Sequence, residues 1–380
     1  MREEPVTAVV TANDAFAADL YGVLTGDTRQ TVFSPVSVAA ALRMALCGAR
    51  GQTAAELGGA LHESPDAAAD GLRATSAAVH DVAADGSVTF RAPSIVWVQS
   101  GLPLRPEFTG QLGDAAAAAI ARVGFAEAPE AARAEINRVI AEQTAGKITG
   151  LLPAAAISDL TRLVLTSAIY LKAAWAERFA EAATRDAPFY PDGPDRPSLT
   201  VPMMHSTAAR AFRHGDRYQA VLLPYQGGQL AMAVVLPDGP LTTLRPAIAA
   251  GGLPGLLTGM SRYQVTLSLP RFRVEAAFDL VPVLRRLGVT QAFTPQADFS
   301  GITEAEPLLI NAVAHKAYVD VDEQGTEAAA ATAISFRPTA AFQAPPAVTM
   351  TVDRPFLFVI FHTPTGTPLF VGQVSQPGVR

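Results

Sequence analysis

The stretch Glu323-Gln-Gly-Thr-Glu-Ala-Ala-Ala-Ala-Thr-Ala-Ile-Ser-Phe-Arg-Pro-Thr339 decides how this chain is interpreted. It follows the run Ala317 to Val321, where apolar and polar residues alternate with the period of two that is typical of a half-buried strand. The next strong apolar run begins only at Phe356, and no charged residue occurs from Pro338 to Val352. Because long ordered loops are uncommon and are usually functional, we expect this loop to carry the function.

The small residues of this stretch suit a strand better than a helix, because a helix from Thr326 to Ala333 would be short and marginal despite its alanines. With a period of two, one face carries Thr326, Ala328, Ala330, Thr332 and Ile334. The other face carries Glu327, Ala329, Ala331 and Ala333. Small side chains and a solvent-facing Glu327 would let the loop enter an existing sheet without a clash or a buried charge. A flexible alanine-rich surface loop is the plainer interpretation.

The composition of the whole chain excludes several classes of protein. Its 380 residues are 49% apolar and 17% charged, with a net charge of −6, so the chain is not disordered. No basic stripe is present, which excludes phosphate-directed nucleic-acid binding. No repeat occurs, and we expect one domain over residues 1–380 although the chain is long for one domain. The abundance of alanine, and of arginine over lysine, is typical of a GC-rich genome.

No residue pattern indicates catalysis, a metal site or a cofactor. The lone Cys47 excludes an internal disulfide and a cysteine-rich zinc site, and the six histidines have no metal-ligand spacing. Nucleophile-elbow, dinucleotide and phosphate-loop motifs are absent, although a Ser/His/Asp triad assembled from distant positions stays open. The longest uncharged stretch, Tyr218 to Pro237, is broken by Pro224 and glycines, so it predicts two buried strands and not a membrane span. The N-terminal residues lack the pattern of a signal peptide, and we expect a cytoplasmic protein.

Local patterns predict an α+β fold, with helices in the first third of the chain and strands in the last half. Expected helices run from Asn13 and Asp14 to Gly26, from the capping Ser34 and Pro35 to Gly48, after a capping box at Thr53 and Glu56, from Glu130 to Gln143, and from Asp279 to Gly288. Expected strands are Val88–Val98, Leu163–Leu171, Val265–Val274 and a C-terminal hairpin of Phe356–Phe361 and Leu369–Val374.

Short motifs in this chain match one known family nearly from end to end. The matching segments are Phe33-Ser-Pro-Val-Ser-Val38, Gly48-Ala-Arg-Gly-Gln-Thr53, Ile136-Asn137, Thr144-Ala-Gly-Lys-Ile148, Ala168-Ile-Tyr-Leu-Lys172 with Trp175, Val201-Pro-Met-Met204, Leu223-Pro-Tyr225, Leu269-Pro-Arg-Phe272, Ala297-Asp-Phe-Ser-Gly301, His315-Lys-Ala317, Glu323 to Ala330, Asp353-Arg-Pro-Phe-Leu-Phe358 and Phe370-Val-Gly372. In this order and spacing, the chain resembles a bacterial-type member of the serpin family of serine protease inhibitors.

The resemblance implies three β-sheets, about nine helices and an exposed reactive-centre loop at about residues 323–347. It also implies that a serine protease attacks the loop, forms an acyl-enzyme, and is trapped when the cut loop inserts as a central strand. The implied hinge consists of Glu323, Gly325, Thr326, Glu327, Ala328, Ala329, Ala330, Ala331 and Thr332. Counting 17 residues from Glu323 places the scissile bond at Thr339-Ala340, which favours elastase-like or subtilisin-like targets. The bonds Ala341-Phe342 and Phe336-Arg337 remain alternatives.

Two further groups of residues carry over from the resemblance. Trp175, Arg271 and Glu323 match the breach, where the loop first enters the sheet, and we expect an ion pair between Arg271 and Glu323. Ser34, Ser37, Ser167 and His315 match the shutter, the hydrogen-bonded cluster beneath the opening strands. Relatives usually have asparagine at the positions of Gln30 and Ser167 and tryptophan near Asn137, where this chain has Val139.

These observations predict a monomeric inhibitor whose partner is a serine protease, with no cofactor, no metal and no nucleic-acid or membrane partner. A serpin-fold protein that binds or chaperones other molecules without trapping a protease is the alternative, and a hydrolase with a dispersed triad is a third. The family resemblance also leaves an extracellular location open.

Overall fold

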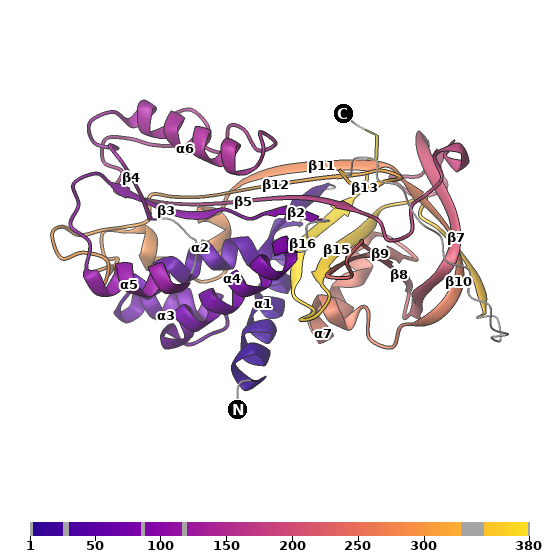
Figure 1. The fold of residues 1–380 in the computed structure, drawn as a ribbon, viewed down its shortest axis with the longest axis horizontal. Coiled ribbons are helices and arrows are strands. Elements are labelled where there is room, and N and C mark those ends of the chain that lie inside the picture. The colour runs from indigo at the N-terminus through magenta and orange to yellow at the C-terminus, as the bar shows by residue number, and fades with distance from the viewer. Residues whose placement is uncertain (1–2, 26–29, 85–87, 116–119, 328–345, 379–380) are drawn as a thin grey trace.

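The computed structural model describes residues 3–25, 30–84, 88–115, 120–327 and 346–378 (Figure 1). Its α-helices are α1 (Glu3–Leu24), α2 (Pro35–Gly48), α3 (Gly51–Ala60), α4 (Ala68–Ala84), α5 (Pro106–Ala115), α6 (Pro129–Gln143), α7 (Arg245–Gly255) and α8 (Val281–Arg286). Its strands are β1 (Thr31–Phe33), β2 (Val88–Arg91), β3 (Ser94–Gln99), β4 (Ile120–Val123), β5 (Leu163–Ala174), β6 (Arg185–Phe189), β7 (Leu199–Gly215), β8 (Tyr218–Pro224), β9 (Leu230–Pro237), β10 (Ser261–Pro270), β11 (Phe272–Asp279), β12 (Ala312–Val321), β13 (Gly325–Thr326), β14 (Ala347–Thr351), β15 (Phe356–His362) and β16 (Pro368–Val374).

A seven-stranded sheet forms the long axis of the molecule, with the order β11-β12-β13-β5-β3-β4 and with β2 paired to β5. Figure 1 shows α6 on one face of this sheet and α2 to α5 on the other. Val164 and Ala168 of β5 pack in a cluster with Ile136 of α6, whereas Leu163 and Leu165 pack with the helices on the opposite face. Because β5 is buried on both faces, it is apolar without alternation, as its sequence predicts.

The nine-stranded sheet consists of two parts that share the long strand β7. Along most of its length β7 pairs with β6 and β10, and only its end, Phe212 to Gly215, pairs with β8. One part is therefore β6-β7-β10-β14, and the other is β8-β9-β15-β16-β1. Together with the seven-stranded sheet, these two parts make up the three-sheet arrangement that the resemblance implies, joined here by continuous hydrogen bonding through β7.

The N-cap at Ser34 is confirmed, since its side chain accepts a hydrogen bond from the Ser37 amide at 3.2 Å and Pro35 opens α2. Two other predicted helix starts are wrong. Helix α1 begins at Glu3, so Asn13 lies inside it, because packing of the helix overrides the weak preference of asparagine for a terminus. The predicted end at Gly26 falls outside the described residues.

The predicted capping box at Thr53 and Glu56 is also wrong, because α3 already begins at Gly51. These two side chains instead fasten α3 to a distant segment of the chain. The Thr53 hydroxyl accepts a hydrogen bond from the Asp298 amide at 3.0 Å, and the Glu56 carboxylate accepts the amides of Thr290 and Gln291 at 2.7 Å each. A polar pair three residues apart therefore serves tertiary structure here.

Two predicted strands are each divided in the structure by a proline. The run Val88–Val98 forms β2 and β3, which flank Ala92-Pro93, and the run Val265–Val274 is divided between β10 and β11 after Pro270. Strand β10 belongs to the nine-stranded sheet, whereas β11 belongs to the seven-stranded sheet. Arg271 is the single residue between them, so it lies where the chain crosses from one sheet to the other.

Substitution of Arg43 would measure how much a buried ion pair contributes to the stability of this fold. Its side chain is fully buried on α2 and donates to the Glu63 carboxylate at 2.8–3.1 Å and to the Thr75 hydroxyl at 3.0 Å. We expect Arg43→Met to lower the free energy of unfolding by about 3–5 kcal/mol, because it leaves the Glu63 carboxylate buried without a partner. Urea denaturation at pH 7 measures this loss.

The matched control is Arg138→Met, which removes an arginine that is 53% exposed and pairs with Glu135 and Glu142 on α6. We expect this variant to lose less than about 1 kcal/mol, as is usual for surface ion pairs. Equal losses in the two variants would show that burial of the Arg43 pair has no energetic significance.

Candidate functional site

The central strands β12 and β5 run parallel and are paired directly from Ala312 and Val164 to Tyr318 and Tyr170. Beyond the two tyrosines the strands separate, and β13 lies between them. Thr326 is opposite Val321 of β12 and Ala173 of β5, and β13 is antiparallel to both neighbours. The first residues of the predicted hinge therefore already occupy the place of a strand in this sheet.

The start of the hinge is tightly packed. Thr326 is fully buried, and its hydroxyl lies 2.6 Å from the hydroxyl of Tyr225. A Cβ at Gly325 would lie 2.1 Å from the carbonyl oxygen of Ala173, and the φ of Gly325 is +151°. Only glycine fits this position, because neither the space nor the backbone angle admits a side chain.

The predicted breach residues converge beside β13. Arg271 donates from Nε and from a terminal guanidinium nitrogen to Glu323 Oε1, at 2.8 and 2.6 Å. The expected ion pair is thus present. Trp175 donates from Nε1 to the Asp322 carbonyl at 2.9 Å, and its ring is stacked on Tyr225 with centroids 4.5 Å apart.

The Glu323 side chain is only 3% exposed, yet it is held as a carboxylate. Burial disfavours the charge, but hydrogen bonds from Arg271 and from the Thr184 hydroxyl outweigh it and lower the pKa of Glu323. Thr184 was not among the residues that the sequence predicts, because nothing in its local sequence marks a contact with a residue so far along the chain.

The shutter residues meet beneath the paired strands. His315 on β12 and Ser167 on β5 are opposite one another, with 2.9 Å between His315 Nδ1 and Ser167 Oγ. The Ser34 amide donates to His315 Nε2 at 3.0 Å, so the imidazole proton lies on Nδ1 and is directed to Ser167. Burial lowers the pKa of His315 to about 4, which makes the ring neutral at pH 7.

Ser37 extends this cluster to a residue that sequence reasoning missed. The Ser37 hydroxyl donates to the Ala168 carbonyl at 3.3 Å and lies 3.4 Å from the Ser94 hydroxyl. Ser94 begins β3 opposite Ser167, and its own hydroxyl donates to the Ser37 carbonyl at 3.0 Å. A single serine after Pro93 carries no motif, so only the strand register reveals it.

Glu327 is placed differently from the solvent-facing position expected in a strand. It has a left-handed φ of 50°, its side chain is 19% exposed, and it forms an ion pair with Lys147. Its amide donates to the Asp320 carbonyl at 3.0 Å. The hinge residues Ala328, Ala329, Ala330, Ala331 and Thr332, and the bond Thr339-Ala340, lie outside the described residues.

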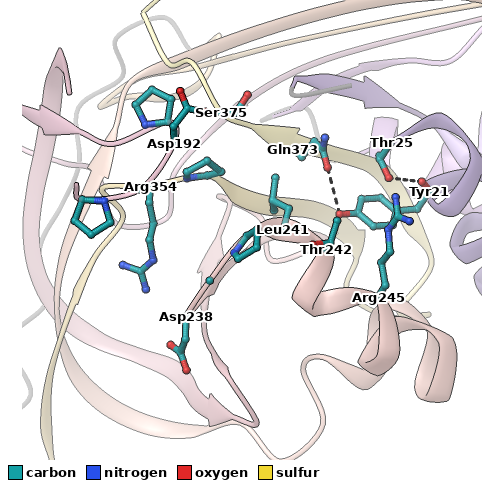
Figure 2. Close-up of a pocket in the computed structure, with 16 residues that line it drawn as sticks. Tyr21, Thr25, Asp192, Asp238, Leu241, Thr242, Arg245, Arg354, Gln373 and Ser375 are labelled. Carbon is teal, nitrogen blue, oxygen red and sulfur yellow. Dashed lines mark hydrogen bonds between the residues drawn. The ribbon is translucent and has the colours of Figure 1, made fainter. Parts of the chain in front are cut away.

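A separate cavity of about 560 Å³, which the sequence did not predict, lies between α1, the start of α7, the end of β16 and residues 191–194. Figure 2 shows Tyr21 and Arg245 on one side of it and Arg354 and Asp238 on the other. The Tyr21 hydroxyl donates to Gln373 Oε1 at 3.3 Å, and burial raises the pKa of Tyr21 to about 12. The cavity therefore combines a neutral phenol and apolar walls with charged groups at its margins.

Two other kinds of feature are absent from the described part of the chain. No cluster of three or more histidine, cysteine, aspartate or glutamate side chains is arranged there to hold a metal ion. No helix in those residues has the length and apolar character needed to cross a membrane.

Comparisons with known proteins agree over almost the whole chain. The family model Serpin (serine protease inhibitor) matches residues 11–377. An uncharacterised serpin-like protein of Thermococcus kodakarensis is 38% identical, over 99% of this chain and 88% of the relative. The leukocyte elastase inhibitor of Bos taurus is 36% identical, over 96% of this chain and 98% of the relative. The crystal structure of human thyroxine-binding globulin in complex with thyroxine has a TM-score of 0.85 and 27% identity, and covers 98% of this chain and 99% of that one.

His315 gives a pH-dependent prediction. Its folded pKa of about 4 lies below the unfolded value of 6.5, so the unfolded chain binds the proton first as the pH falls. The stabilisation by neutral His315 is complete above pH 6.5 and is lost as the pH falls towards 4. We expect the difference in unfolding free energy between the wild type and His315→Gln to shrink by about 3 kcal/mol between pH 7 and pH 4.

The comparison of two proteins isolates this contribution, because other groups titrate in the same range. Burial raises the pKa of Asp14 to about 7 and lowers that of His362, and both groups contribute equally to the wild type and the variant. Urea denaturation at several pH values provides the measurement. A difference that stays constant with pH would mean that His315 is not held neutral by the fold.

Proposed function

The chain belongs to the serpin family, and we propose that it inhibits a serine protease as a suicide substrate. In this proposal the protease cuts the loop of residues 323–347 and forms an acyl-enzyme. The cut loop then inserts between β5 and β12, and the attached protease is carried along before it can deacylate. Proteases commonly turn over at about 1–10³ per second, so insertion must be at least as fast.

The placement of β13 is the observation that best supports this proposal. Continued down the sheet, its register places Ala328 between Val319 and Leu171, Ala330 between Ala317 and Ile169, and Thr332 between His315 and Ser167. All of these neighbours are buried. The uncharged face of the loop, which carries Ala328, Ala330 and Thr332, would therefore meet the core, as an inserting strand requires.

Addition of a strand supplies the driving force in the proposed mechanism, and the direction of that strand adds to it. β12 and β5 are parallel, whereas β13 is antiparallel to each of them. Insertion would replace one parallel ladder by two antiparallel ladders, which are slightly more stable per residue. At about 1 kcal/mol net per added hydrogen bond, a dozen new bonds rival the whole stability of about 5–15 kcal/mol of an ordinary domain.

The same geometry identifies what has to open first. The seven direct residue pairs between β12 and β5, from Ala312–Val164 to Tyr318–Tyr170, must separate. We call this line of pairs the seam, and the hydrogen bond between His315 and Ser167 crosses it. Thr332 would arrive between these two side chains, where its hydroxyl can replace each as a partner of the other. A neutral His315 lets the seam open without exposing or burying a charge.

The sequence at the proposed scissile bond suggests the partner. Thr339-Ala340 has a small residue on each side of the bond, which suits elastase-like or subtilisin-like proteases, and two of the relatives of this chain are leukocyte elastase inhibitors of cattle and pig. We propose that the inhibitor acts as a monomer. Its single Cys47 forms no internal disulfide, which fits a cytoplasmic location.

A hydrolase is less well supported than an inhibitor. The closest approach of serine to histidine in the shutter is Ser167 to His315, and both side chains are buried beneath the paired strands. The second ring nitrogen of His315 accepts the Ser34 amide and so has no carboxylate to orient it. A buried serine–histidine pair without an orienting acid and without access to substrate suits a structural role.

The proposal predicts a trapped protease complex. Incubation with elastase, subtilisin, chymotrypsin and trypsin should give, with at least one of them, a complex that survives denaturant and gel electrophoresis. Mass analysis of the released C-terminal peptide should identify Thr339-Ala340 as the bond that is cut. Cleavage without a complex, and without a large rise in melting temperature, would overturn the inhibitory function.

Two glutamate substitutions separate insertion from recognition of the loop. Ala330→Glu should abolish the trapped complex while cleavage continues, because its carboxylate would be carried between the buried Ala317 and Ile169. Ala347→Glu adds the same charge at an exposed residue on the other side of the scissile bond, and it should still trap the protease. Trapping by Ala330→Glu equal to that of the wild type would contradict loop insertion.

Binding of a small molecule is a second candidate function, favoured by the cavity of about 560 Å³ (Figure 2). A structural neighbour, thyroxine-binding globulin, was crystallised with thyroxine. We propose that an amphipathic carboxylate would suit this cavity, because Pro240, Leu241 and Pro355 supply apolar walls and Arg245 supplies a cation beside the neutral Tyr21. This role is compatible with inhibition, because the cavity lies away from β13.

Calorimetric titration with thyroxine as the probe tests the second candidate. We expect Arg245→Gln to weaken binding by about tenfold or more, the size of a lost charge-assisted hydrogen bond. Arg138→Gln, on the distant helix α6, should bind as the wild type does. Absence of binding, or equal affinity of the Arg245→Gln variant, would exclude this cavity as a carboxylate site.

A further inference from the structure

Two lysines lie on either side of the path that Glu327 must follow if the loop inserts. We propose that Glu327 exchanges its ion pair with Lys147 for one with Lys172 during insertion. Lys147 then acts as a positioning residue that retains the hinge in the uncut protein, and Lys172 receives the carboxylate in the inserted strand. This inference rests on the proposed function and adds residues that control its rate.

The first half of the exchange is present in the structure. Lys147 follows the end of α6, the helix that covers the seven-stranded sheet, and its ammonium forms an ion pair with Glu327 Oε1. The ammonium also lies 5.9 Å from the ring centroid of Tyr318, the last residue of β12 that is paired directly with β5. The pair therefore ties the hinge to the segment after α6 at the point where the two strands separate.

The backbone of Glu327 shows what this ion pair retains. Thr326 is still part of β13, but Glu327 has a φ of 50°, a left-handed conformation that is unfavourable for a residue with a side chain. The strand consequently stops at Thr326. Extension by even one residue requires Glu327 to return to an extended conformation, and this removes its carboxylate from Lys147.

The register of β13 identifies the next neighbours of Glu327. Thr326 is opposite Val321 and Ala173, so an extended Glu327 would be opposite Asp320 on β12 and Lys172 on β5. Its side chain would share the sheet face of these two residues, because the pleat alternates. Opposite charges in cross-strand positions are favourable, whereas like charges are unfavourable. Asp320 already lies opposite Arg273 of β11, and Lys172 is the cation that Glu327 would meet on its β5 side.

Lys172 is available for this purpose. Within the described residues, no carboxylate forms an ion pair with Lys172, whereas the other two lysines of the chain are paired with Glu327 and Glu275. The exchange therefore leaves Glu327 with a cation in both end states. Between them the carboxylate has left Lys147 while its ion pair with Lys172 is only partly formed, which slows the first step of insertion and protects the uncut protein from premature opening.

The exchange predicts opposite effects of the two lysines, which a merely structural role would not produce. Lys147→Gln should speed insertion of the cut loop, and Lys172→Gln should slow it, each by roughly threefold to fivefold, the size expected for a partly exposed ion pair. Lys147→Arg should restore the wild-type rate, because it keeps the charge. The control Glu275→Gln breaks the 2.7 Å ion pair between Lys316 and Glu275 on the same sheet and should change neither rate.

Hydrogen exchange read by mass spectrometry provides both measurements. In the uncut protein, the Glu327 amide donates to the Asp320 carbonyl. Its hydrogen should exchange faster in Lys147→Gln than in the wild type, and at the wild-type rate in Lys172→Gln. After the loop is cut, pulse labelling of the peptide that contains residues 327–335 follows the gain of protection as the strand forms. This readout does not depend on whether a protease is trapped.

The outcomes distinguish this inference from the proposed function. If both lysine variants behave like Glu275→Gln in both measurements, the proposed exchange of ion pairs is excluded, and the proposed inhibitory function is unaffected. A wild-type loop that never gains protection after cleavage overturns the proposed function, and the transfer to Lys172 with it. In that case, hydrogen exchange of the Glu327 amide in the uncut protein still tests whether Lys147 retains the hinge. An unchanged rate of hydrogen exchange in Lys147→Gln would exclude that role of Lys147.

Discussion

The direct parallel pairing of β5 with β12 holds the centre of this molecule together, and the described residues of the hinge, the breach and the shutter are placed with respect to it. Both strands are buried on two faces, so they cannot separate unless another strand satisfies their backbone hydrogen bonds. Among the described residues, the segment already positioned to do so is β13, at the end where the pairing stops. In the proposed mechanism, this sheet is stable while closed and more stable with one strand added.

The charged groups along this seam differ in burial, and burial determines what each contributes. Glu323, beside Arg271, is almost fully buried and is kept ionised by its hydrogen bonds, so loss of the arginine would leave an uncompensated charge. His315, deeper in the seam, is neutral because burial opposes its charge. Glu327 is partly exposed and can change partners. The outer end of the seam is therefore held by ion pairs, and the inner part is held by hydrogen bonds between neutral groups.

Local sequence was sufficient for elements whose signals are local, such as the Ser34 cap, the buried run of β5 and the C-terminal hairpin. It was insufficient where distant segments decide the structure. Thr53 and Glu56 have the spacing of a capping box, but hydrogen bonds to residues 290–298 determine their role. The crossing at Arg271, the contacts of Thr184 and Ser94, and the cavity beside Tyr21 depend on strand order and register, which periodicity does not contain. The breach and shutter residues that the family resemblance indicated lie together in the structure, because that resemblance encodes such long-range pairings.

Glu327 shows why one charged residue is found among the alanines of the hinge. A charge on the face that carries Thr326, Ala328 and Ala330 would be buried in the core, so insertion tolerates a charge only on the alternate face. On that face, alanine at position 327 would leave Asp320 and Lys172 to each other, and the left-handed turn would have no ion pair to hold it. A carboxylate satisfies a lysine in the bent hinge and a different lysine in the extended strand. The two conformations can then differ mainly in hydrogen bonding along the sheet. The free energy gained by strand addition is not reduced by leaving a carboxylate without a cation.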